Sequence, residues 1–339
     1  MIQLQLQQKE ELESLIRFRE SETKLGEKIT LCDSLDSLSE LTQKFVIFGI
    51  CEDIGVQANY GKSGASNAWN VFLNSFCNIQ VNSYNKESNV ILLGKITVSP
   101  DEEINEKTDR NILGAIVKRI DNKVAIVVQR IIEAGKIPIV IGGGHNNAYG
   151  NLKGATNALG QALNCVNIDA HTDLRLTDYR HSGNGFSYAL NDKEGPYLNK
   201  YGVFGLHKNY TPQYVFNFIE EHNKKHGHTI TYKFMEDMLF PNAQLEAFSD
   251  FINTIIDESF GLELDCDSIA SFPSSAMSPS GFSLNTTRSF VKLLSASRYC
   301  RYFHICEAAP SLANSQQVGK ALTYLVTDFI QNNDGNNII

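Results

Sequence analysis

Three short polar segments of the chain carry the side-chain types that bind divalent metal ions. In the first, DAHTD, the residues Asp169, His171 and Asp173 stand at alternating positions. Residues two apart in an extended segment project to the same side, so these two carboxylates and one imidazole can converge on one point. The segment therefore predicts one side of a metal site.

The other two segments contain the same kinds of side chain. ELDCD places Asp265 and Asp267 on one side and Cys266 on the other, and GGGHNN supplies His145. Each segment alone is a modest signal, because an aspartate pair often ends a strand in solvent and a glycine run before a histidine is commonly only a turn. Together they are more specific, because all three follow apolar runs typical of buried strands.

Charge balance indicates how many ions the site would hold. The four aspartates of these segments would repel one another in a partly desolvated cleft, and two divalent ions would balance their charge. An oxygen-rich set with imidazoles suits Mn²⁺ better than a thiolate zinc site does. We therefore predict two Mn²⁺ per chain, with other divalent ions as alternatives, held by His145, Asp169, His171, Asp173, Asp265 and Asp267.

The elements that must position these residues alternate between apolar strands and amphipathic helices. This alternation is typical of a parallel sheet covered by helices on both faces. We predict an α/β, single-domain, three-layer α-β-α fold with a mainly parallel sheet of about eight strands. Ligands bind at the carboxyl ends of such strands, where the polar segments stand. The expected strands are 44–50, 90–96, 137–143, 163–169, 201–206, 228–234, 260–267 and 301–307, and the main helices are 110–135, 147–160, 212–225, 242–257, 285–297 and 316–331.

The two ends of the chain depart from the alternating pattern. Residues 1–40 are polar and charge-rich, with helical spacing around Leu12 and Leu15, and are predicted to form an N-terminal helical extension. The α/β domain is expected over 41–331, and 332–339 are expected to form a flexible tail.

Composition excludes several classes of protein. The formal net charge of -8 and the pI of about 5.5 argue against nonspecific nucleic-acid binding, which needs clustered Lys and Arg. The N-terminus lacks an apolar signal-peptide core, and no apolar run approaches the ~20 residues that span a bilayer. The seven cysteines include no CxxC pair, which indicates free thiols in a reducing compartment. We therefore predict a soluble, cytoplasmic protein that binds neither nucleic acid nor membrane.

The motifs GGGH, DAHTD and DCD, in this order, resemble the metal motifs of the ureohydrolase family, which comprises arginases, agmatinases and formimidoylglutamases. The resemblance runs from about residue 45 to 330 and includes the loop GVQANYGKSGAS. It implies a metal-dependent hydrolase, often a homo-oligomer. His145 and Asp173 would be terminal ligands of one ion, His171 and Asp267 would be terminal ligands of the other, and Asp169 and Asp265 would bridge.

The resemblance also implies a mechanism. Two ions lower the pKa of a shared water, which attacks an sp² carbon bonded to nitrogen. Asp173 can accept a hydrogen bond from that water, and Glu307, in HICEAAP, falls at the family's active-site glutamate. The departing amine needs an acid. His181 is the nearest candidate in sequence, and the alternative is an ordinary surface histidine.

The substrate is inferred from departures within the family. Arg175, in DAHTDLR, would repel a guanidinium and attract a carboxylate, unless it is an ion-pair partner of Asp178. DLR, GGGH and an SGNGFS loop resemble formimidoylglutamases, so Arg175, Asn184 and Glu307 are expected to bind N-formimidoyl-L-glutamate. Hydrolysis would yield L-glutamate and formamide in histidine degradation. The alternatives are arginase- or agmatinase-type release of urea from a guanidino substrate, and a non-catalytic binding protein.

Two positions depart from the family pattern. Ala270 and Ser271 stand where an Asp-Pro pair is expected, and Asn146 follows GGGH in place of an acidic residue or serine. Neither position is an expected metal ligand, so these departures concern the shape of the substrate loop.

Overall fold

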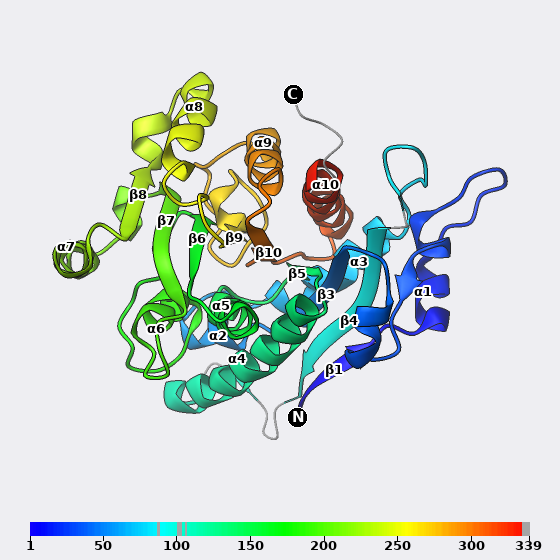
Figure 1. Cartoon of the computed structure of the whole chain (residues 1–339), viewed down its shortest axis with the longest axis horizontal. Coiled ribbons are helices and arrows are strands. Elements are labelled where there is room, and N and C mark those ends of the chain that lie inside the picture. The colour runs from blue at the N-terminus through cyan, green and yellow to red at the C-terminus, as the bar shows by residue number, and fades with distance from the viewer. Residues whose placement is uncertain (87–88, 100–103, 106, 334–339) are drawn as a thin grey trace.

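The fold is built on one large, mainly parallel sheet with helices on both faces (Figure 1). The computed structural model describes residues 1–86, 89–99, 104–105 and 107–333. The strands are β1 (Ile2–Leu6), β2 (Thr30–Leu31), β3 (Phe45–Cys51), β4 (Val90–Val98), β5 (Ile137–Ile141), β6 (Leu163–Ile168), β7 (Leu198–Leu206), β8 (Ile230–Phe234), β9 (Phe260–Asp265) and β10 (Cys300–Cys306). The α-helices are α1 (Lys9–Leu15), α2 (Ile54–Ala58), α3 (Ala68–Phe76), α4 (Arg110–Glu133), α5 (Asn147–Leu159), α6 (Gly185–Asn191), α7 (Gln213–His226), α8 (Pro241–Ile252), α9 (Leu284–Ser295) and α10 (Ser315–Asn333).

The strand order is β1-β4-β3-β5-β10-β9-β6-β7-β8, and β2 also pairs with β4. All pairs are parallel except β1 with β4, which is antiparallel. The predicted fold class is confirmed, and each of the eight predicted strands is present as one of β3 to β10. The sheet has ten strands because the N-terminal segment adds two that were not predicted.

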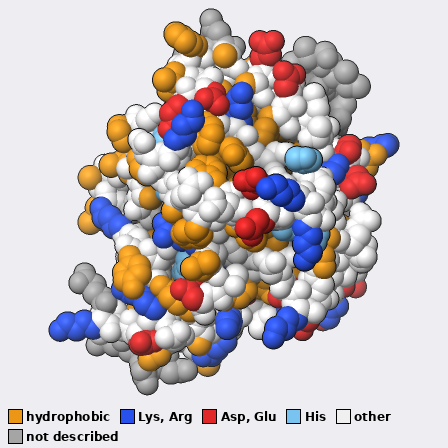
Figure 2. All heavy atoms as spheres, turned by 90° about the vertical axis from the view of Figure 1, so that its left-hand side faces the viewer, with side chains coloured by type: hydrophobic (Ala, Val, Ile, Leu, Met, Phe, Trp, Pro, Cys, Tyr) orange, Lys and Arg blue, Asp and Glu red, His pale blue; other side chains and the backbone are white. Residues whose placement is uncertain are grey.

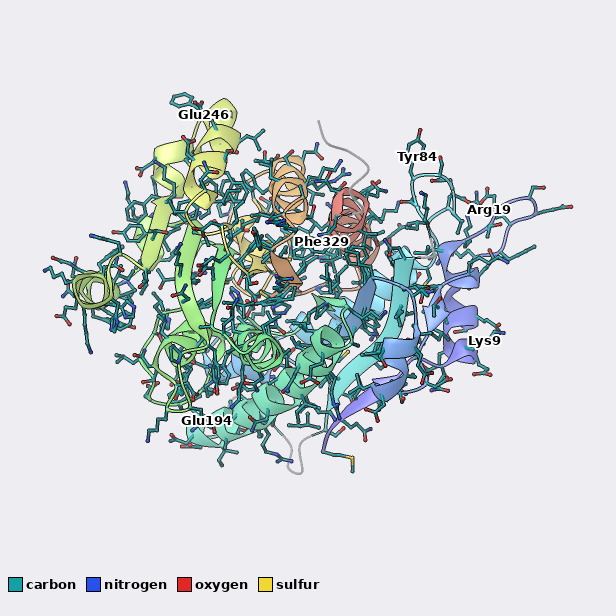
Figure 3. All side chains as sticks on the ribbon, viewed as in Figure 1. Lys9, Arg19, Tyr84, Glu194, Glu246 and Phe329 are labelled. Atoms are coloured by element: carbon teal, nitrogen blue, oxygen red, sulfur yellow. The ribbon has the colours of Figure 1, made fainter. Side chains whose placement is uncertain are left out.

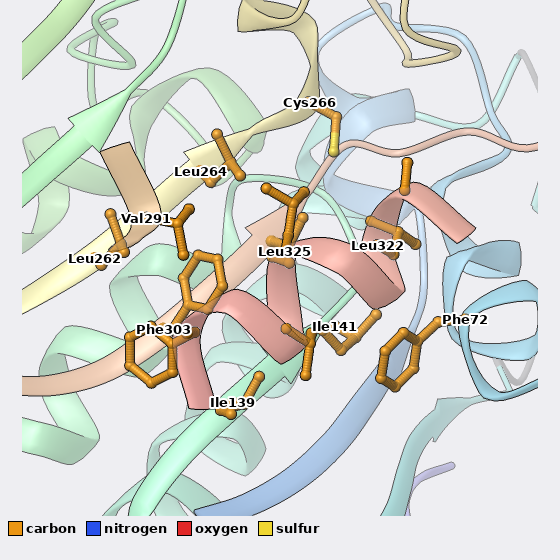
Figure 4. Packing of buried hydrophobic residues seen from close by; sticks show 14 of the residues in the cluster. Phe72, Ile139, Ile141, Leu262, Leu264, Cys266, Val291, Phe303, Leu322 and Leu325 are labelled. Atoms are coloured by element: carbon orange, nitrogen blue, oxygen red, sulfur yellow. The ribbon is translucent and has the colours of Figure 1, made fainter. Parts of the chain in front are cut away.

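Strand alternation divides the core into two layers. Phe45 and Ile47 of β3 face the cluster that contains α3, α9 and α10, whereas Val46 and Phe48 face the cluster that contains α4 and α5. Helix α10 packs across the first face (Figure 4). Its Phe329, labelled in Figure 3, stacks on Phe303 of β10 with ring centroids 4.9 Å apart. Burial on both sides explains why these strands are continuously apolar.

The N-terminal segment is not wholly helical. It contains α1, as the spacing around Leu12 predicts, but it also contributes β1 and β2. β1 pairs with Gly94–Val98 and β2 pairs with Ile91 and Leu92, so the two short strands share one edge of β4. The alternating burial of β1 is the strand signal that the helical interpretation missed.

The C-terminal helix extends beyond its predicted end. α10 continues through Asn333, whose side chain donates to the carbonyl of Ser295 at 2.7 Å. The predicted tail therefore begins with two helical residues, and its remainder, 334–339, lies outside the described residues.

The surface shown in Figure 2 carries acidic and basic side chains interspersed with hydrophobic ones. Within the described part of the chain, no helix is both long and apolar enough to cross a membrane. The seven cysteines are all unpaired thiols, as predicted, and Trp69 is buried in the core.

Candidate metal centre

Four adjacent strands at the middle of the sheet bring the predicted residues to one edge. β5, β10, β9 and β6 are neighbours in that order. The segments that follow their carboxyl ends carry His145, Glu307, Asp267 and Asp169, respectively. Because the strands are parallel, these distant segments of the chain meet at the same edge.

A first group of side chains surrounds one nitrogen of His145. Its Nδ1 lies 2.9 Å from Oδ2 of Asp173, 3.1 Å from Oδ2 of Asp169 and 3.3 Å from Oδ2 of Asp265. One nitrogen and three carboxylate oxygens thus face a common point, a donor set that could hold a divalent cation.

A second group lies beside the first and shares Asp169 with it. Nδ1 of His171 lies 2.9 Å from Oδ2 of Asp267 and 3.6 Å from Oδ1 of Asp169. Asp169 therefore offers one oxygen to each group, as a bridging ligand would. Asp265, which was also expected to bridge, belongs only to the first group.

The environment of these groups fits a pair of cations. Nδ1 of His145 is fully buried and, among the described residues, has no hydrogen-bond partner although three carboxylates surround it. Burial, followed by Asp267 and Asp169, raises the pKa of Asp265 well above its usual value, and burial with Asp169 raises that of Asp173. The pKa of Asp169 is instead lowered, because hydrogen bonds with His145 and His171 outweigh the effect of burial. Asp173 and Asp265 are therefore the carboxylates that are costly to ionise here, and bound cations would reduce this cost.

Backbone conformation at two of the predicted residues is unusual. Asp173 has φ of 48° and Glu307 has φ of 60°, in the left-handed region that side chains other than glycine rarely adopt. Such strain persists only where surrounding contacts hold it, and it is frequent at functional sites. Gly143 has φ of 75°, and a Cβ there would lie 2.5 Å from Nδ2 of Asn147, so the GGGH turn requires glycine at this position.

Glu307 connects the end of β10 to the GGGH turn. Its Oε1 accepts from the backbone N–H of His145 at 2.7 Å, and its Oε2 accepts from the hydroxyl of Ser275. Burial raises the pKa of Glu307 to about 7 despite these two bonds. Ser275 belongs to the loop that contains the departures at Ala270 and Ser271, so this bond joins that loop to the site.

Glu52, immediately after β3, is a buried residue that the sequence analysis missed. Its Oε1 accepts from the N–H of Gly144 and the side-chain amides of Asn146 and Asn147, at 3.1, 3.1 and 2.6 Å. Its Oε2 accepts from two backbone N–H groups of α2. One carboxylate therefore supports the turn that carries His145. The signal available in the sequence was an acidic residue directly after an apolar strand.

The loop between β6 and α6 is anchored by Arg180. This guanidinium is buried, and it donates to both oxygens of Asp121, to the carbonyl of Asn146 and to Oδ1 of Asn184. The amide of Asn184 in turn donates to the carbonyls of Leu176 and Tyr179 at 2.9 and 2.7 Å. These bonds occupy both ends of the Asn184 amide, so they give no support to its predicted contact with substrate.

His181 lies in the same loop as a buried imidazole. Its Nδ1 accepts from the N–H of Gly183 at 3.1 Å. Burial, followed by the charge of Arg180, lowers its pKa to about 4. The ring is therefore neutral near pH 7, which argues against the predicted role as a general acid and also against the alternative of an exposed surface histidine.

Arg175 follows Asp173 by two residues, and its side chain is exposed. Within the described ranges of the chain, no ion pair joins it to Asp178 or to another carboxylate. Its side chain lies against Gly183, where a Cβ would be 2.9 Å from Cδ of Arg175. The guanidinium is therefore exposed and has no carboxylate partner among the described residues.

An aromatic stack lies against the second group. Tyr210 stacks on His171 with ring centroids 5.4 Å apart and on His207 with centroids 5.3 Å apart. Tyr210 is 45% exposed, so it borders the open side of His171.

Comparison with known proteins agrees with this arrangement. Residues 43–330 match the model of the arginase family. The chain is 25% identical over 294 residues to the formimidoylglutamase of Lysinibacillus sphaericus, and this match covers 84% of each chain. It is 28% identical over 200 residues to that of Macrococcus caseolyticus, a match that spans 58% of each chain.

A crystal structure of Trypanosoma cruzi formiminoglutamase with Mn²⁺ superposes with a TM-score of 0.73 at 18% identity, over 94% of this chain and all of that one. At this identity the superposition is evidence for the fold alone. The family model covers most of the sequence, from before β3 to the last turn of α10. The chain therefore belongs to the arginase family.

Proposed function

We propose that this protein is a metal-dependent hydrolase that converts N-formimidoyl-L-glutamate and water to L-glutamate and formamide, as in histidine degradation. The observation that carries the proposal is the pair of donor groups that share Asp169 at the carboxyl edge of the sheet. The names of the relatives from Lysinibacillus sphaericus and Macrococcus caseolyticus support the substrate.

We propose two Mn²⁺ as the cofactors. His145 and Asp173 would hold one ion and His171 and Asp267 the other, with Asp169 between them. Asp265 would complete the first set. The oxygen-rich donors favour Mn²⁺, and so does the metal named with the Trypanosoma cruzi structure. When bound, two such ions lower the pKa of a water and stabilise negative charge that develops on the substrate.

The residues of the chain would then position the reactants. One oxygen of Asp173 faces Nδ1 of His145 within the first group. The carboxylate of Asp173 can also accept a hydrogen bond from the attacking water. The water oxygen adds to the formimidoyl carbon, the bond from that carbon to the glutamate nitrogen breaks, and a proton passes to the departing amine. Glu307 supports the turn of His145, because its Oε1 accepts from the backbone N–H of His145.

Arg175 supports a preference for an anionic substrate. Its guanidinium is exposed, close to Asp173 in the chain, and no carboxylate among the described residues neutralises it. A planar guanidinium can bind a carboxylate through two parallel hydrogen bonds, and it repels a guanidinium substrate. N-formimidoyl-L-glutamate offers two carboxylates, whereas agmatine offers none.

The direct test is a substrate panel with Mn²⁺-loaded protein. Formamide and glutamate should be released from N-formimidoyl-L-glutamate, with little urea from arginine or agmatine. Urea release as the main activity would support the arginase or agmatinase alternative. Two bound ions without turnover of any of these substrates would support a binding protein instead.

Assembly and location remain predictions from the sequence. We propose a cytoplasmic homo-oligomer that acts on a small molecule and binds neither nucleic acid nor membrane. Sedimentation analysis of the purified protein and fractionation of the source cells would test both predictions.

A further inference from the structure

A row of polar residues crosses three strands of the sheet, two or three residues before the carboxyl-end residues Asp169, Asp265 and Glu307. Asn167 of β6, Glu263 of β9 and His304 of β10 are paired in register across the three strands. All three are fully buried. They face the α4 and α5 layer, from which Asn151 donates to Oε1 of Glu263 at 3.3 Å. Burial of polar groups is costly unless they are paired, so this row requires an explanation.

His304 and Glu263 form the central contact of the row. Nδ1 of His304 lies 2.5 Å from Oε2 of Glu263, and its Nε2 lies 3.1 Å from the carbonyl of Gly142. A carbonyl can only accept, so Nε2 of His304 carries a proton. The contact holds Oε2 of Glu263 in place and ties it to the first residues of the GGGH turn.

Glu263 also faces His145 from below. Its Oε2 lies 3.7 Å from Nε2 of His145, the ring nitrogen that points away from the aspartates. That nitrogen is buried and has no hydrogen-bond partner among the described residues. If Nδ1 of His145 binds a cation through its lone pair, the ring proton must be on Nε2, where it points toward Glu263. Carboxylates behind a ligand histidine commonly fix its tautomer and orientation in this way.

We propose that Glu263, held by His304, is the positioning residue for the metal ligand His145. The contacts form a closed path from Gly142 through His304 and Glu263 to His145, so the turn and its support are fixed together. The inference rests on the proposed function, because it assigns Glu263 a role toward one of the two proposed ions. It predicts that Glu263 acts on the ion of His145 and not on the ion of His171.

A competing assignment makes Glu263 itself a ligand. Nε2 of His145, a carboxylate oxygen of Glu263 and Sγ of Cys306 also lie close enough to hold an ion. However, both oxygens of Glu263 are already in contact, Oε2 with His304 and Oε1 with Asn151. A third ion there would have to displace these contacts. The geometry therefore favours the positioning role of Glu263 over a role as ligand.

The test is Mn²⁺ binding by the full-length protein and its Glu263→Gln variant. Calorimetric titration should give two ions for the parent. In the variant, one ion should bind about 10- to 100-fold more weakly while the other is unchanged. EPR of Mn²⁺ at intermediate loading should change from a coupled pair to a single ion, and kcat should fall at saturating substrate with KM retained.

Asp328→Asn is the matched control, because Asp328 is an equally buried, ion-paired carboxylate on α10, outside the site. It should bind both ions as the parent does. Glu263→Leu, which also removes the acceptor oxygen, should weaken the first ion further than Glu263→Gln does.

Each remaining outcome has a distinct meaning. Two ions bound with parental affinity by Glu263→Gln would overturn the positioning role. A parent with three ions that falls to two in the variant would make Glu263 a ligand and would also overturn it. A parent that binds no Mn²⁺ would instead overturn the proposed function. Unfolding of the metal-free proteins separates any effect on stability from the effect on binding.

Discussion

Arg180 donates Nε–H to Oδ2 of Asp121 at 2.8 Å and Nη2–H to Oδ1 at 3.0 Å, so one bidentate ion pair joins the loop after β6 to α4. Both side chains are buried. The same guanidinium donates to the carbonyl of Asn146, the residue after His145. The pair therefore ties two of the three segments that supply the first metal group to one helix.

Removal of Asp121 should destabilise the protein strongly. Asp121→Ala leaves the buried guanidinium of Arg180 without its counter-charge, and the expected loss in free energy of unfolding is about 3–5 kcal/mol. Urea unfolding measures it. Asp328→Ala is the comparison: its partner Arg288 is 31% exposed, so the loss should be smaller. Equal losses in the two variants would contradict the argument from burial.

Asp169 should be necessary for both ions. Asp169→Asn removes a charge that both donor groups share, so neither ion should bind tightly, and hydrolysis should fall below detection. Metal analysis after dialysis measures the ion content. Asp267→Asn should instead retain the ion of His145. A parental ion content in Asp169→Asn would rule out the shared role of this carboxylate.

Added Mn²⁺ should stabilise the parent protein, because the ligand binds only the folded state. At a free concentration 100 times Kd, the expected gain is about 2.7 kcal/mol for each site. Thermal unfolding with and without a chelator measures the effect. Asp169→Asn should show little response to the metal, and a response equal to that of the parent would place the stabilising ion elsewhere.

Arg175→Ala should raise KM for N-formimidoyl-L-glutamate by about 10-fold or more, because a bidentate charge-assisted contact is lost. Metal content and unfolding should be unchanged, since the side chain is exposed. Arg175→Lys should recover only part of the loss, because an ammonium cannot form the paired contact. A parental KM in Arg175→Ala would remove this residue from the substrate site.

His181 should make the protein sensitive to acid. Its pKa is about 4 in the folded protein, mainly through burial, and about 6.5 in an unfolded chain. Since the folded pKa is the lower one, the unfolded state binds the proton first. The contribution of His181 is complete above pH ~6.5 and is lost as the pH falls toward 4, by on the order of 2–3 kcal/mol.

Urea unfolding of metal-free protein between pH 4 and pH 7 checks this. His181→Asn keeps an acceptor near the position of Nδ1 but does not titrate there, so its stability should fall less steeply with acid. Parallel curves for the parent and the variant would show that His181 does not take up the proton.

The sequence was informative where a short-range pattern determines the structure. Polar residues directly after an apolar run indicated Asp169, His171 and Asp173, but they do not converge on one point, because Asp173 leaves the extended conformation and His171 lies in the second group. Apolar runs predict β3 to β10 because both faces of the sheet are buried. β1 was missed because its alternation covers only five residues and is followed shortly by helix α1.

Residues that act through distant contacts could not be found in this way. Glu52 accepts hydrogen bonds from N–H groups of Gly144 and Asn147, which are distant in the sequence. Glu263 lies beside His304 only because of the register between β9 and β10. The roles expected of His181 and Asn184 were inferred from their proximity to DAHTD in the sequence. The structure does not support them, because Arg180 binds both residues and holds this loop inward. Local spacing thus indicates the ligands, whereas their supports depend on tertiary structure.

The position of β10 has a consequence for how the protein is made. This strand is among the last elements of the chain, yet it lies between β5 and β9 and separates the strand of His145 from the strands of the aspartates. Until the ribosome has released it, β5 and β9 each present an unpaired edge, and the two halves of the cation site have no fixed spacing. Metal uptake should therefore follow synthesis of the chain through β10, and a nascent chain that stops before β10 would expose strand edges that favour aggregation.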